Sequence, residues 1–352
     1  MNRIGLLGCG TVGSGVKELI DANSDKYTLV KVFDLPSKKD YLGDKYAESY
    51  EEVCSSPYID TVIECLGGDN IAYPAIKMAL SNSKNVITSN KETIALHLEE
   101  YLNLANKNYV SIRFEASVGG GIPLLDTVLK ISAFDELLGF EGILNGTTNF
   151  IITKMFDEDM SFEEALSLAQ EKGFAEKDPT ADLLGLDMVR KGQILSEIGY
   201  HIKVNQSQIP NRGINLLNQD IVKEIKKMGK YLKFVVKSTF DTSLHLEVTP
   251  VLIDYSSPLM SVKNEFNAVT LHYKNNGDIV LSGKGAGKLP TAGAIMQDLT
   301  LINQDKGILH LSFKETSNLI INNKKYFVVE ESSSRVVDKL EDKEYTFVAE
   351  IL

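Results

Sequence analysis

A lysine and an aspartate one helical turn apart are the residues of this chain best placed to do chemistry. They lie in the segment GFAEKDPTADLLGLDMVRK, 173–191, whose second half continues as a predicted helix. The apolar stripe of this helix comprises Leu184, Met188, Leu195 and Ile198, and its polar side comprises Arg190, Gln193 and Glu197. Lys191 falls on the apolar stripe and Asp187 lies one turn before it, so the helix turns an ionic pair toward its buried side. Burying charge is costly, which favours either a catalytic ammonium group or a structural salt bridge whose lysine extends to solvent.

The composition is that of an ordinary soluble globular protein. The chain has 352 residues, of which 43% are hydrophobic and 24% charged, enough for two domains. Its formal net charge of -11 argues against nucleic acid or an anionic membrane as a main partner. The three cysteines, Cys9, Cys54 and Cys65, form no disulfide framework, and no long apolar run opens the chain. We therefore expect a cytoplasmic protein that acts on a small-molecule substrate.

A glycine-rich turn near the N-terminus predicts dinucleotide binding. Gly8, Gly10 and Gly13 match G-x-G-x-x-G between a strand-like run, 4–7, and a helix-like run, 16–22. Glycines in this context allow a tight turn and a close approach of the backbone to a pyrophosphate, which then lies at the helix N-terminus. A glycine-rich turn with another role is the alternative.

The choice between NAD and NADP stays open at this stage. Asp34 ends the next apolar run, where a carboxylate can bind a ribose 2′-hydroxyl group. Lys38 and Lys39 follow closely and could instead bind a 2′-phosphate.

Strand and helix patterns alternate over the first third of the chain, which predicts a Rossmann-type, doubly wound parallel sheet. Ligands of such sheets gather at the carboxyl ends of the strands, where we find the segments 66–68, 89–91 and 115–123. Lys91 follows a strand directly and could bind an anionic group, or it could be a solvated lysine at a helix start. The last of these segments, EASVGGGIP, could bind a hard cation through backbone carbonyls and Glu115, although a tight loop that needs glycine dihedrals is the simpler explanation.

The second part of the chain predicts an α+β domain. A helix is expected over 125–138 and a strand over 140–144, followed by a polar turn in which Thr147 can donate to a substrate. Later strands lack long intervening helices and predict an antiparallel sheet. We expect a dinucleotide-binding domain over 1–124, a second domain over 125–299 whose last helix returns to the first, and a strand-rich tail over 300–352.

The order of several motifs makes the chain resemble homoserine dehydrogenase. These are GCGTVG, SNKETIA, FEASVGGGIPLL, GILNGTTNFI, GFAEKDPTADLLGLDMVRK and GKGAGKLPTAGAIMQD, and the likeness covers about residues 1 to 300. The resemblance implies a nucleotide-binding domain and a catalytic domain that also forms a homodimer. It further implies reversible NAD(P)-linked conversion of L-aspartate 4-semialdehyde to L-homoserine, a step that feeds threonine, methionine and isoleucine biosynthesis.

The resemblance also implies roles for individual residues. Lys191 matches the proton donor to the aldehyde oxygen, and Lys91 matches a second lysine of the site. Glu176 matches the glutamate that binds the substrate's amino group, with Asp182 and Asp187 as supporting acids. The matching cofactor contacts are Thr11, Val12, Leu66, Lys91, Gly173 and Gly287. The matching ligands of a structural sodium ion, mainly through carbonyls, are Glu115, Val118, Gly120 and Ile122.

Some features depart from the family pattern or favour a rival. Phe33 stands before Asp34, where many bacterial relatives carry a basic residue, and this weakens the expectation of NADP. The tail 300–352 is short for the ACT regulatory domain that many relatives carry. A phosphorylating semialdehyde dehydrogenase needs a later cysteine nucleophile, and none follows Cys65. A catalytically silent NAD(P)-binding regulatory protein on the same scaffold is the remaining alternative.

Overall fold

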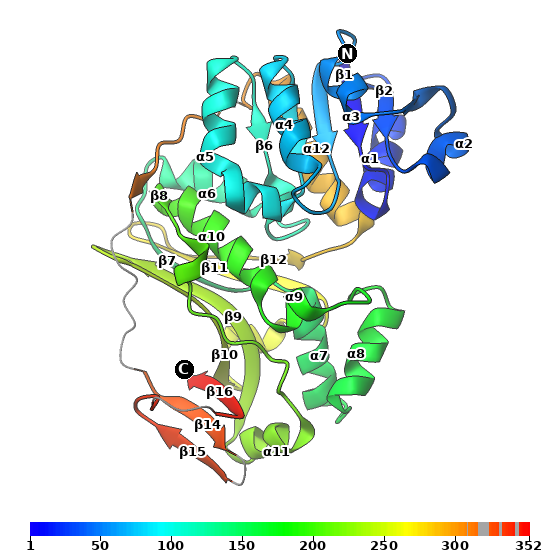
Figure 1. The fold of residues 1–352 in the computed structure, drawn as a ribbon. Helices are drawn as coiled ribbons and strands as arrows, with labels where there is room; N and C mark the ends of the chain where they lie inside the picture. Colours follow the sequence, from blue (N-terminus) through cyan, green and yellow to red (C-terminus); the bar gives the residue numbers. More distant parts are fainter. Residues whose placement is uncertain (308, 316–323, 331–332, 342–344) are drawn as a thin grey trace. The chain divides into compact units, whose positions relative to one another are not determined.

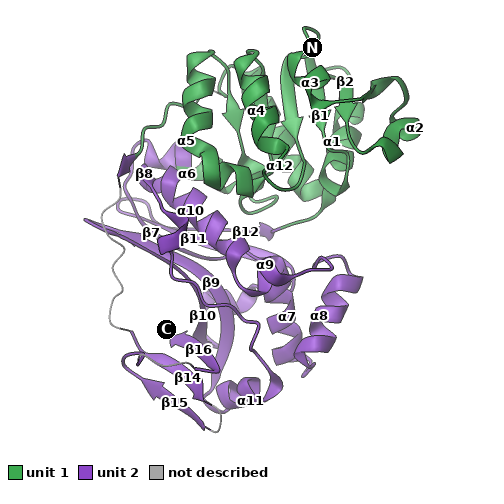
Figure 2. Cartoon of the chain, viewed as in Figure 1, with its two compact units in different colours: residues 1–128, 286–313 green, residues 129–285, 314–352 purple. Residues whose placement is uncertain are grey.

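The chain folds into two compact units. The computed structural model describes residues 1–307, 309–315, 324–330, 333–341 and 345–352. Unit 1 comprises residues 1–128 and 286–313, and unit 2 comprises residues 129–285 and 314–352 (Figure 2). No helix in these described ranges is both long and apolar enough to span a membrane.

Unit 1 is built on a six-stranded parallel sheet of order β3-β2-β1-β4-β5-β6 (Figure 1). Its strands are β1 Asn2–Leu7, β2 Tyr27–Phe33, β3 Tyr46–Ala47, β4 Thr61–Glu64, β5 Asn85–Thr88 and β6 Ile112–Arg113. Its helices are α1 Thr11–Ala22, α2 Lys39–Leu42, α3 Tyr50–Ser55, α4 Ala72–Ser81, α5 Lys91–Lys107, α6 Leu124–Ser132 and α12 Lys288–Asn303. This order is that of a doubly wound dinucleotide-binding fold, so the predicted Rossmann-type sheet is confirmed. β4 is buried at every position, as expected of a strand inside a sheet covered on both faces.

Helix α12 is remote in sequence from the rest of unit 1. It packs against α1, and its Ala292, Ile295 and Leu299 belong to the same buried cluster as Ile4 and Val16. The chain thus leaves unit 1 within α6, after Val128, and returns at Ala286 to complete its core.

Unit 2 contains an eight-stranded sheet of order β12-β11-β7-β9-β10-β16-β14-β15. Its strands are β7 Leu137–Ile143, β9 Lys230–Phe240, β10 Leu244–Asp254, β11 Phe266–Tyr273, β12 Gly277–Lys284, β14 Tyr326–Glu330, β15 Ser333–Val337 and β16 Phe347–Ile351. Its helices are α7 Gly146–Asp157, α8 Phe162–Glu171, α9 Thr180–Leu183, α10 Leu186–Tyr200 and α11 Gln219–Lys227. A small parallel pair is formed by β8 Ile202–Lys203 and β13 Lys314–Glu315. The sheet is antiparallel except where β16 runs parallel to β10, so the tail makes it a mixed sheet.

The tail is joined to this sheet through buried charges. Lys237 on β9 lies 2.6 Å from Glu350 on β16, and both side chains are at most 15% exposed. Lys324 contacts Glu247 on β10 and lies 3.3 Å from Glu350. These pairs tie the tail strands to the centre of unit 2.

Two local predictions differ from the structure. The helix expected over 125–138 is too long, because α6 ends at Ser132 and β7 already begins at Leu137. Gln193 and Glu197, expected on the polar side of α10, are buried. Helix α10 is enclosed on more than one side, and Glu197 accepts hydrogen bonds there from Gln193 and from the backbone of Val204.

Candidate active site

Lys191 and Asp187 form a buried ion pair on one turn of α10. Nζ of Lys191 lies 2.7 Å from Oδ2 of Asp187, and the two side chains are 10% and 7% exposed. The same Nζ donates a hydrogen bond of 2.6 Å to the backbone carbonyl of Leu144, just after β7. This is the inward-facing ion pair that the helical period predicted.

Asn145 connects this pair to a second carboxylate. Its Nδ2 donates to Oδ1 of Asp182 at 2.6 Å and to Oδ2 of Asp187 at 2.9 Å. Its Oδ1 accepts from the backbone N–H of Thr148 at 2.9 Å, so Asn145 is also the N-cap of α7. One amide therefore fixes two carboxylates beside Lys191. Two carboxylates and one ammonium group are thus held together at this end of α10.

The turn between α9 and α10 explains how the two aspartates meet. Gly185 has φ +79° and begins α10 in the left-handed region. A Cβ at this position would lie 2.6 Å from Oδ1 of Asn211 and 2.8 Å from the ring of Phe234. Only glycine satisfies both the backbone angle and the space, and the resulting sharp turn brings Asp182 and Asp187 onto the same amide.

The other predicted residues of unit 2 lie around the loop after α8. Thr147 is buried, and its Oγ1 donates to the carbonyl of Phe174 at 2.5 Å. Gly173, with φ +74°, ends α8, and Glu176 follows on the exposed part of this loop. Within the described ranges the carboxylate of Glu176 has no hydrogen bond or ion pair, whereas its carbonyl accepts from Gln170. The structure thus brings Thr147 to this loop but leaves the Glu176 side chain in solvent.

The glycine turn of unit 1 has the shape that phosphate binding requires. Gly8 has φ +87°, and a Cβ on Gly13 would lie 1.9 Å from the Gly8 carbonyl, so both positions demand glycine. Around Gly10, by contrast, no atom lies within 4 Å of an added Cβ, which leaves open space beside the turn. Helix α1 then begins at Thr11 without a side-chain cap or an acidic first turn, so its N–H groups and dipole favour an anion.

A second helix start lies beside the first. Gly287, with φ +120°, is the N-cap of α12. A Cβ on Gly15 of α1 would lie 2.9 Å from the carbonyl of Lys288, so the first turn of α12 contacts α1 closely. Val12 packs against the same buried cluster as α12. Unit 1 therefore brings Thr11, Val12 and Gly287 to adjacent helix ends.

Asp34 lies beside the glycine turn. It follows β2 directly, and its carboxylate accepts hydrogen bonds from the backbone N–H of Cys9 and, at 2.6 Å, from that of Leu35. Lys39 forms an ion pair with Glu48, and Nζ of Lys38 lies 5.8 Å from the centre of the Tyr41 ring. The Asp34 carboxylate is thus held beside the glycine turn, while one of the two lysines already has a carboxylate partner.

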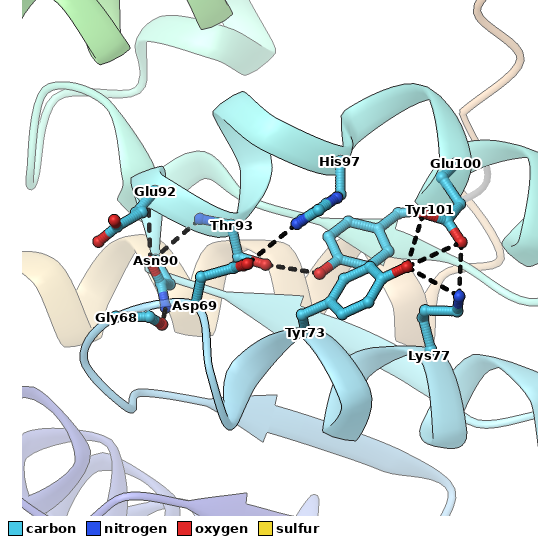
Figure 3. Close-up of polar contacts among 10 residues, drawn as sticks. All are labelled: Gly68, Asp69, Tyr73, Lys77, Asn90, Glu92, Thr93, His97, Glu100 and Tyr101. Carbon is cyan, nitrogen blue, oxygen red and sulfur yellow. Dashed lines mark hydrogen bonds and ion pairs between the residues drawn. The ribbon is translucent and has the colours of Figure 1, made fainter.

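Asn90 joins the two loops that carry Leu66 and Lys91. Its Nδ2 donates to the carbonyls of Leu66 at 3.4 Å and Gly68 at 2.7 Å, and its Oδ1 caps α5 (Figure 3). Lys91, half-buried, is the first residue of α5. These loops follow β4 and β5, so the structure confirms that two of the predicted carboxyl-end segments lie together.

The loop 115–123 begins in a buried charged cluster. Arg113 lies 3.0 Å from Asp298 and 3.3 Å from Asp126, and the Glu115 carboxylate accepts from the backbone N–H groups of Leu125 and Asp126. Burial raises the pKa of Glu115 to about 7, and the nearby Asp298 carboxylate adds to this rise. In the described ranges no group of three or more His, Cys, Asp or Glu side chains is arranged to hold a metal ion. A cation here would have to rest on backbone carbonyls.

The chain matches two family descriptions, "Homoserine dehydrogenase" over residues 123–300 and "Homoserine dehydrogenase, NAD binding domain" over residues 8–115. The chain belongs to the homoserine dehydrogenase family. It is 38% identical over 326 residues to a homoserine dehydrogenase of Bacillus subtilis (strain 168), which covers 88% of this chain and 75% of that relative.

Solved structures of homoserine dehydrogenases share this architecture. The enzyme from Thiobacillus denitrificans has a TM-score of 0.86 at 29% identity, covering 94% of this chain and 83% of that one. The S. aureus enzyme crystallised at pH 7.5 has a TM-score of 0.81 at 29% identity and covers 100% of this chain and 98% of that one. This homoserine dehydrogenase is therefore an NAD(P)-dependent oxidoreductase that interconverts L-aspartate 4-semialdehyde and L-homoserine.

Two connecting residues of the site were not predicted from the sequence. Asn145 lies in the polar turn that contains Thr147, and nothing local shows that its amide reaches Asp182 and Asp187. Glu64, fully buried at the end of β4, was not singled out at all. Its signal was present: a single acid closes the otherwise apolar run TVIE just before the turn Gly67-Gly68.

Proposed function

We propose that Lys191 is the proton donor in the reduction of the aldehyde to L-homoserine. When NAD(P)H is bound it supplies the hydride, and negative charge then grows on the substrate's aldehyde oxygen. An ammonium group held by Asp187 and by the Leu144 carbonyl can stabilise that charge and deliver a proton. The observation that carries this proposal is the position of the Lys191 Nζ, buried yet fixed by two acceptors.

The two carboxylates beside Lys191 support a role in binding the substrate's ammonium group. Asp182 and Asp187 are both held by Asn145, so their lone pairs are oriented before a ligand arrives. Glu176 adds a third carboxylate on the exposed loop after α8. Thr147 holds this loop by donating a hydrogen bond to the carbonyl of Phe174. We assign Glu176 to the substrate's amino group, which requires its side chain to turn from solvent toward the ligand.

For the cofactor, we assign the pyrophosphate to the N-terminal end of α1, where Gly10 leaves room. Asp34 is assigned to the ribose, and this favours NAD(H) because a second negative group beside that carboxylate would be repelled. Lys91 is assigned to an anionic group of substrate or cofactor. Gly173 belongs to unit 2, and its assignment as a cofactor contact rests on the family pattern alone.

We assign a structural sodium ion to the carbonyls of Glu115, Val118, Gly120 and Ile122. The loop supports this assignment because all four residues are buried, and Glu115, Val118 and Ile122 are at most 2% exposed. The neighbouring cluster contains the carboxyl groups of Glu115, Asp126 and Asp298 beside the guanidinium group of Arg113, and carboxylates stabilise a nearby cation.

A homodimer is proposed from the family pattern and from the edge of the unit 2 sheet. β12 is an edge strand, and Val280 on it is 61% exposed. A second copy would cover this apolar side chain and pair the open strand edge.

The direct test is turnover. Purified protein mixed with L-homoserine and NAD⁺ or NADP⁺ should give a rise in absorbance from the reduced nicotinamide. The Lys191→Ala variant should lose this turnover while its binding of NADH, followed by fluorescence, stays within about twofold of wild type. Near-normal turnover in Lys191→Ala would refute the assigned role.

A further inference from the structure

Glu64 is a buried carboxylate that the mechanism above leaves without a role. It is 0% exposed at the end of β4, between Leu7 of β1 and Thr88 of β5. No lysine, arginine or histidine of the described ranges forms an ion pair with it. Burying a carboxylate here costs free energy, so packing alone does not explain a glutamate at this position.

The hydrogen bonds around Glu64 all have Glu64 as the final acceptor. The backbone N–H of Asn90 donates to Oγ1 of Thr88 at 2.9 Å, so the Thr88 hydroxyl hydrogen is left to donate to Oε2 of Glu64. The other oxygen, Oε1, accepts from the backbone N–H of Leu66 at 2.6 Å. Both oxygens of Glu64 thus act as acceptors, which is the pattern of an ionised carboxylate.

This chain of hydrogen bonds joins the two loops to which the proposed function assigns Leu66 and Lys91. The hydrogen bond from its backbone N–H to Thr88 fixes the backbone of Asn90, the residue before Lys91. The side-chain amide of Asn90 in turn donates to the carbonyl of Leu66. Farther along the same loop, Nε2 of His97 lies 3.1 Å from Oδ2 of Asp69, which holds the loop on α5 (Figure 3). The loop after β4 is therefore fixed to α5 at two points, by Asn90 at the N-cap and by His97 in the helix.

We propose that Glu64 is a positioning residue of this enzyme, which holds Leu66 and Lys91 in the arrangement that binds the nicotinamide cofactor. The proposal rests on the cofactor roles assigned to those two residues. Glu64 itself touches neither substrate nor cofactor. It acts through Thr88, Asn90 and the backbone of Leu66, and it acts in its ionised form.

Glu64 is a titratable group of this network, together with His97 and Asp69, which hold the same loop. Burial raises the pKa of Glu64 to about 7, against the opposing effect of its hydrogen bonds to Thr88, Leu66 and Asn90. Cys65 and Tyr101 are further titratable neighbours, and burial raises the pKa of both, so both stay neutral below pH 8. Protonation of Glu64 would leave the Thr88 hydrogen without its acceptor and loosen the network.

The test compares Glu64→Gln with the wild-type enzyme. A glutamine keeps the size of the side chain but presents a donor to Thr88, so we expect the Kd for NADH and the KM for the cofactor to rise by about tenfold, the effect of one lost hydrogen bond. We expect kcat/KM for the cofactor to fall as the pH drops through about 7 in the wild type, and this step to be absent in Glu64→Gln. The thermal midpoint of Glu64→Gln should equal or exceed that of the wild type at pH 8, because a buried charge has been removed. A merely structural role predicts the opposite change in stability.

Two further variants keep the result decisive. Thr88→Val removes the same link without changing Glu64 and should also weaken NADH binding, which covers the case in which Glu64→Gln fails to fold. Thr61→Val, at the other end of β4, changes a buried hydroxyl that has no partner in the described ranges, and should leave NADH binding within about twofold of wild type.

Lys91→Ala separates this inference from the proposed function. If Lys91→Ala binds NADH and turns over normally, the cofactor role of Lys91 fails. If Lys91→Ala is impaired while Glu64→Gln and Thr88→Val bind NADH normally with an unchanged pH profile, the proposal for Glu64 is overturned.

Discussion

The Lys191–Asp187 pair should contribute to stability and to catalysis in separable ways. Both side chains are at most 10% exposed at a separation of 2.7 Å, so removing one partner leaves a buried charge. Such a change costs about 3–5 kcal/mol. We expect the lower end for Lys191→Met, about 3 kcal/mol, because Asn145 still donates to Asp187 at 2.9 Å. Asp187→Asn should cost a similar amount, because the ammonium group of Lys191 keeps the Leu144 carbonyl as an acceptor but loses its charged partner.

The double variant separates the effect of the buried charges on stability from the effect of the changed packing. Lys191→Met with Asp187→Asn leaves neither charge, so urea unfolding should show it about 2 kcal/mol more stable than the sum of the single losses predicts. Turnover should fall at least a hundredfold in Lys191→Met and in the double variant alike, because the proton donor is absent from both. A double variant whose loss equals the sum of the single losses would show that the pair is not coupled. A Lys191→Met enzyme with more than a tenth of wild-type kcat would refute the catalytic role.

Three other predictions concern unit 1. Asp34→Ser should lower kcat/KM for NADH by about tenfold and affect NADPH less, and equal losses in steady-state kinetics would contradict the ribose assignment. Burial raises the pKa of Glu115 from 4.5 to about 7 and that of Asp298 from 3.8 to about 6. At pH values between the unfolded and folded pKa values, the folded chain therefore binds more protons than the unfolded chain. The free energy of unfolding from urea titrations should therefore fall between about pH 4.5 and pH 7, less steeply in Glu115→Gln, and an equal slope in that variant would exclude Glu115 as a source. Replacing sodium chloride by choline chloride at equal ionic strength should lower the thermal midpoint, and an unchanged midpoint would count against the cation site.

Much of the fold could be predicted because contacts between residues that are close in the sequence determine it. The glycines of the first turn are dictated by contacts within a few residues, such as Gly13 against the Gly8 carbonyl, and so they appear as a short motif. The alternation of strands and helices in unit 1 follows from the burial of a parallel sheet on both faces. Lys191 and Asp187 lie four residues apart on one helix, so their pairing was visible from the helical period.

The parts that could not be predicted depend on contacts between distant residues. Asn145 reaches Asp187 across 42 positions, and Thr88 reaches Glu64 across 24, so no local pattern reveals either link. Gln193 and Glu197 look like a solvent-facing side of α10, and only the folded chain shows that this side is covered too. The tail strands read as an appendage, because their burial depends on Lys237 and Glu247 of remote strands.

The late return of α12 to unit 1 has a consequence for the order in which the protein can mature as it is synthesised. Asp298 supplies the carboxylate that receives both Arg113 and the backbone N–H of Glu115, and it is translated more than 180 residues after them. While the ribosome is still making unit 2, the nucleotide-binding half lacks one of its helices, and the buried guanidinium group of Arg113 lacks one of its two carboxylate partners. The first half of this polypeptide must therefore wait for the second half to be nearly complete before its own core can close, and a truncated product that ends before α12 would expose the apolar side of α1 to chaperones and proteases.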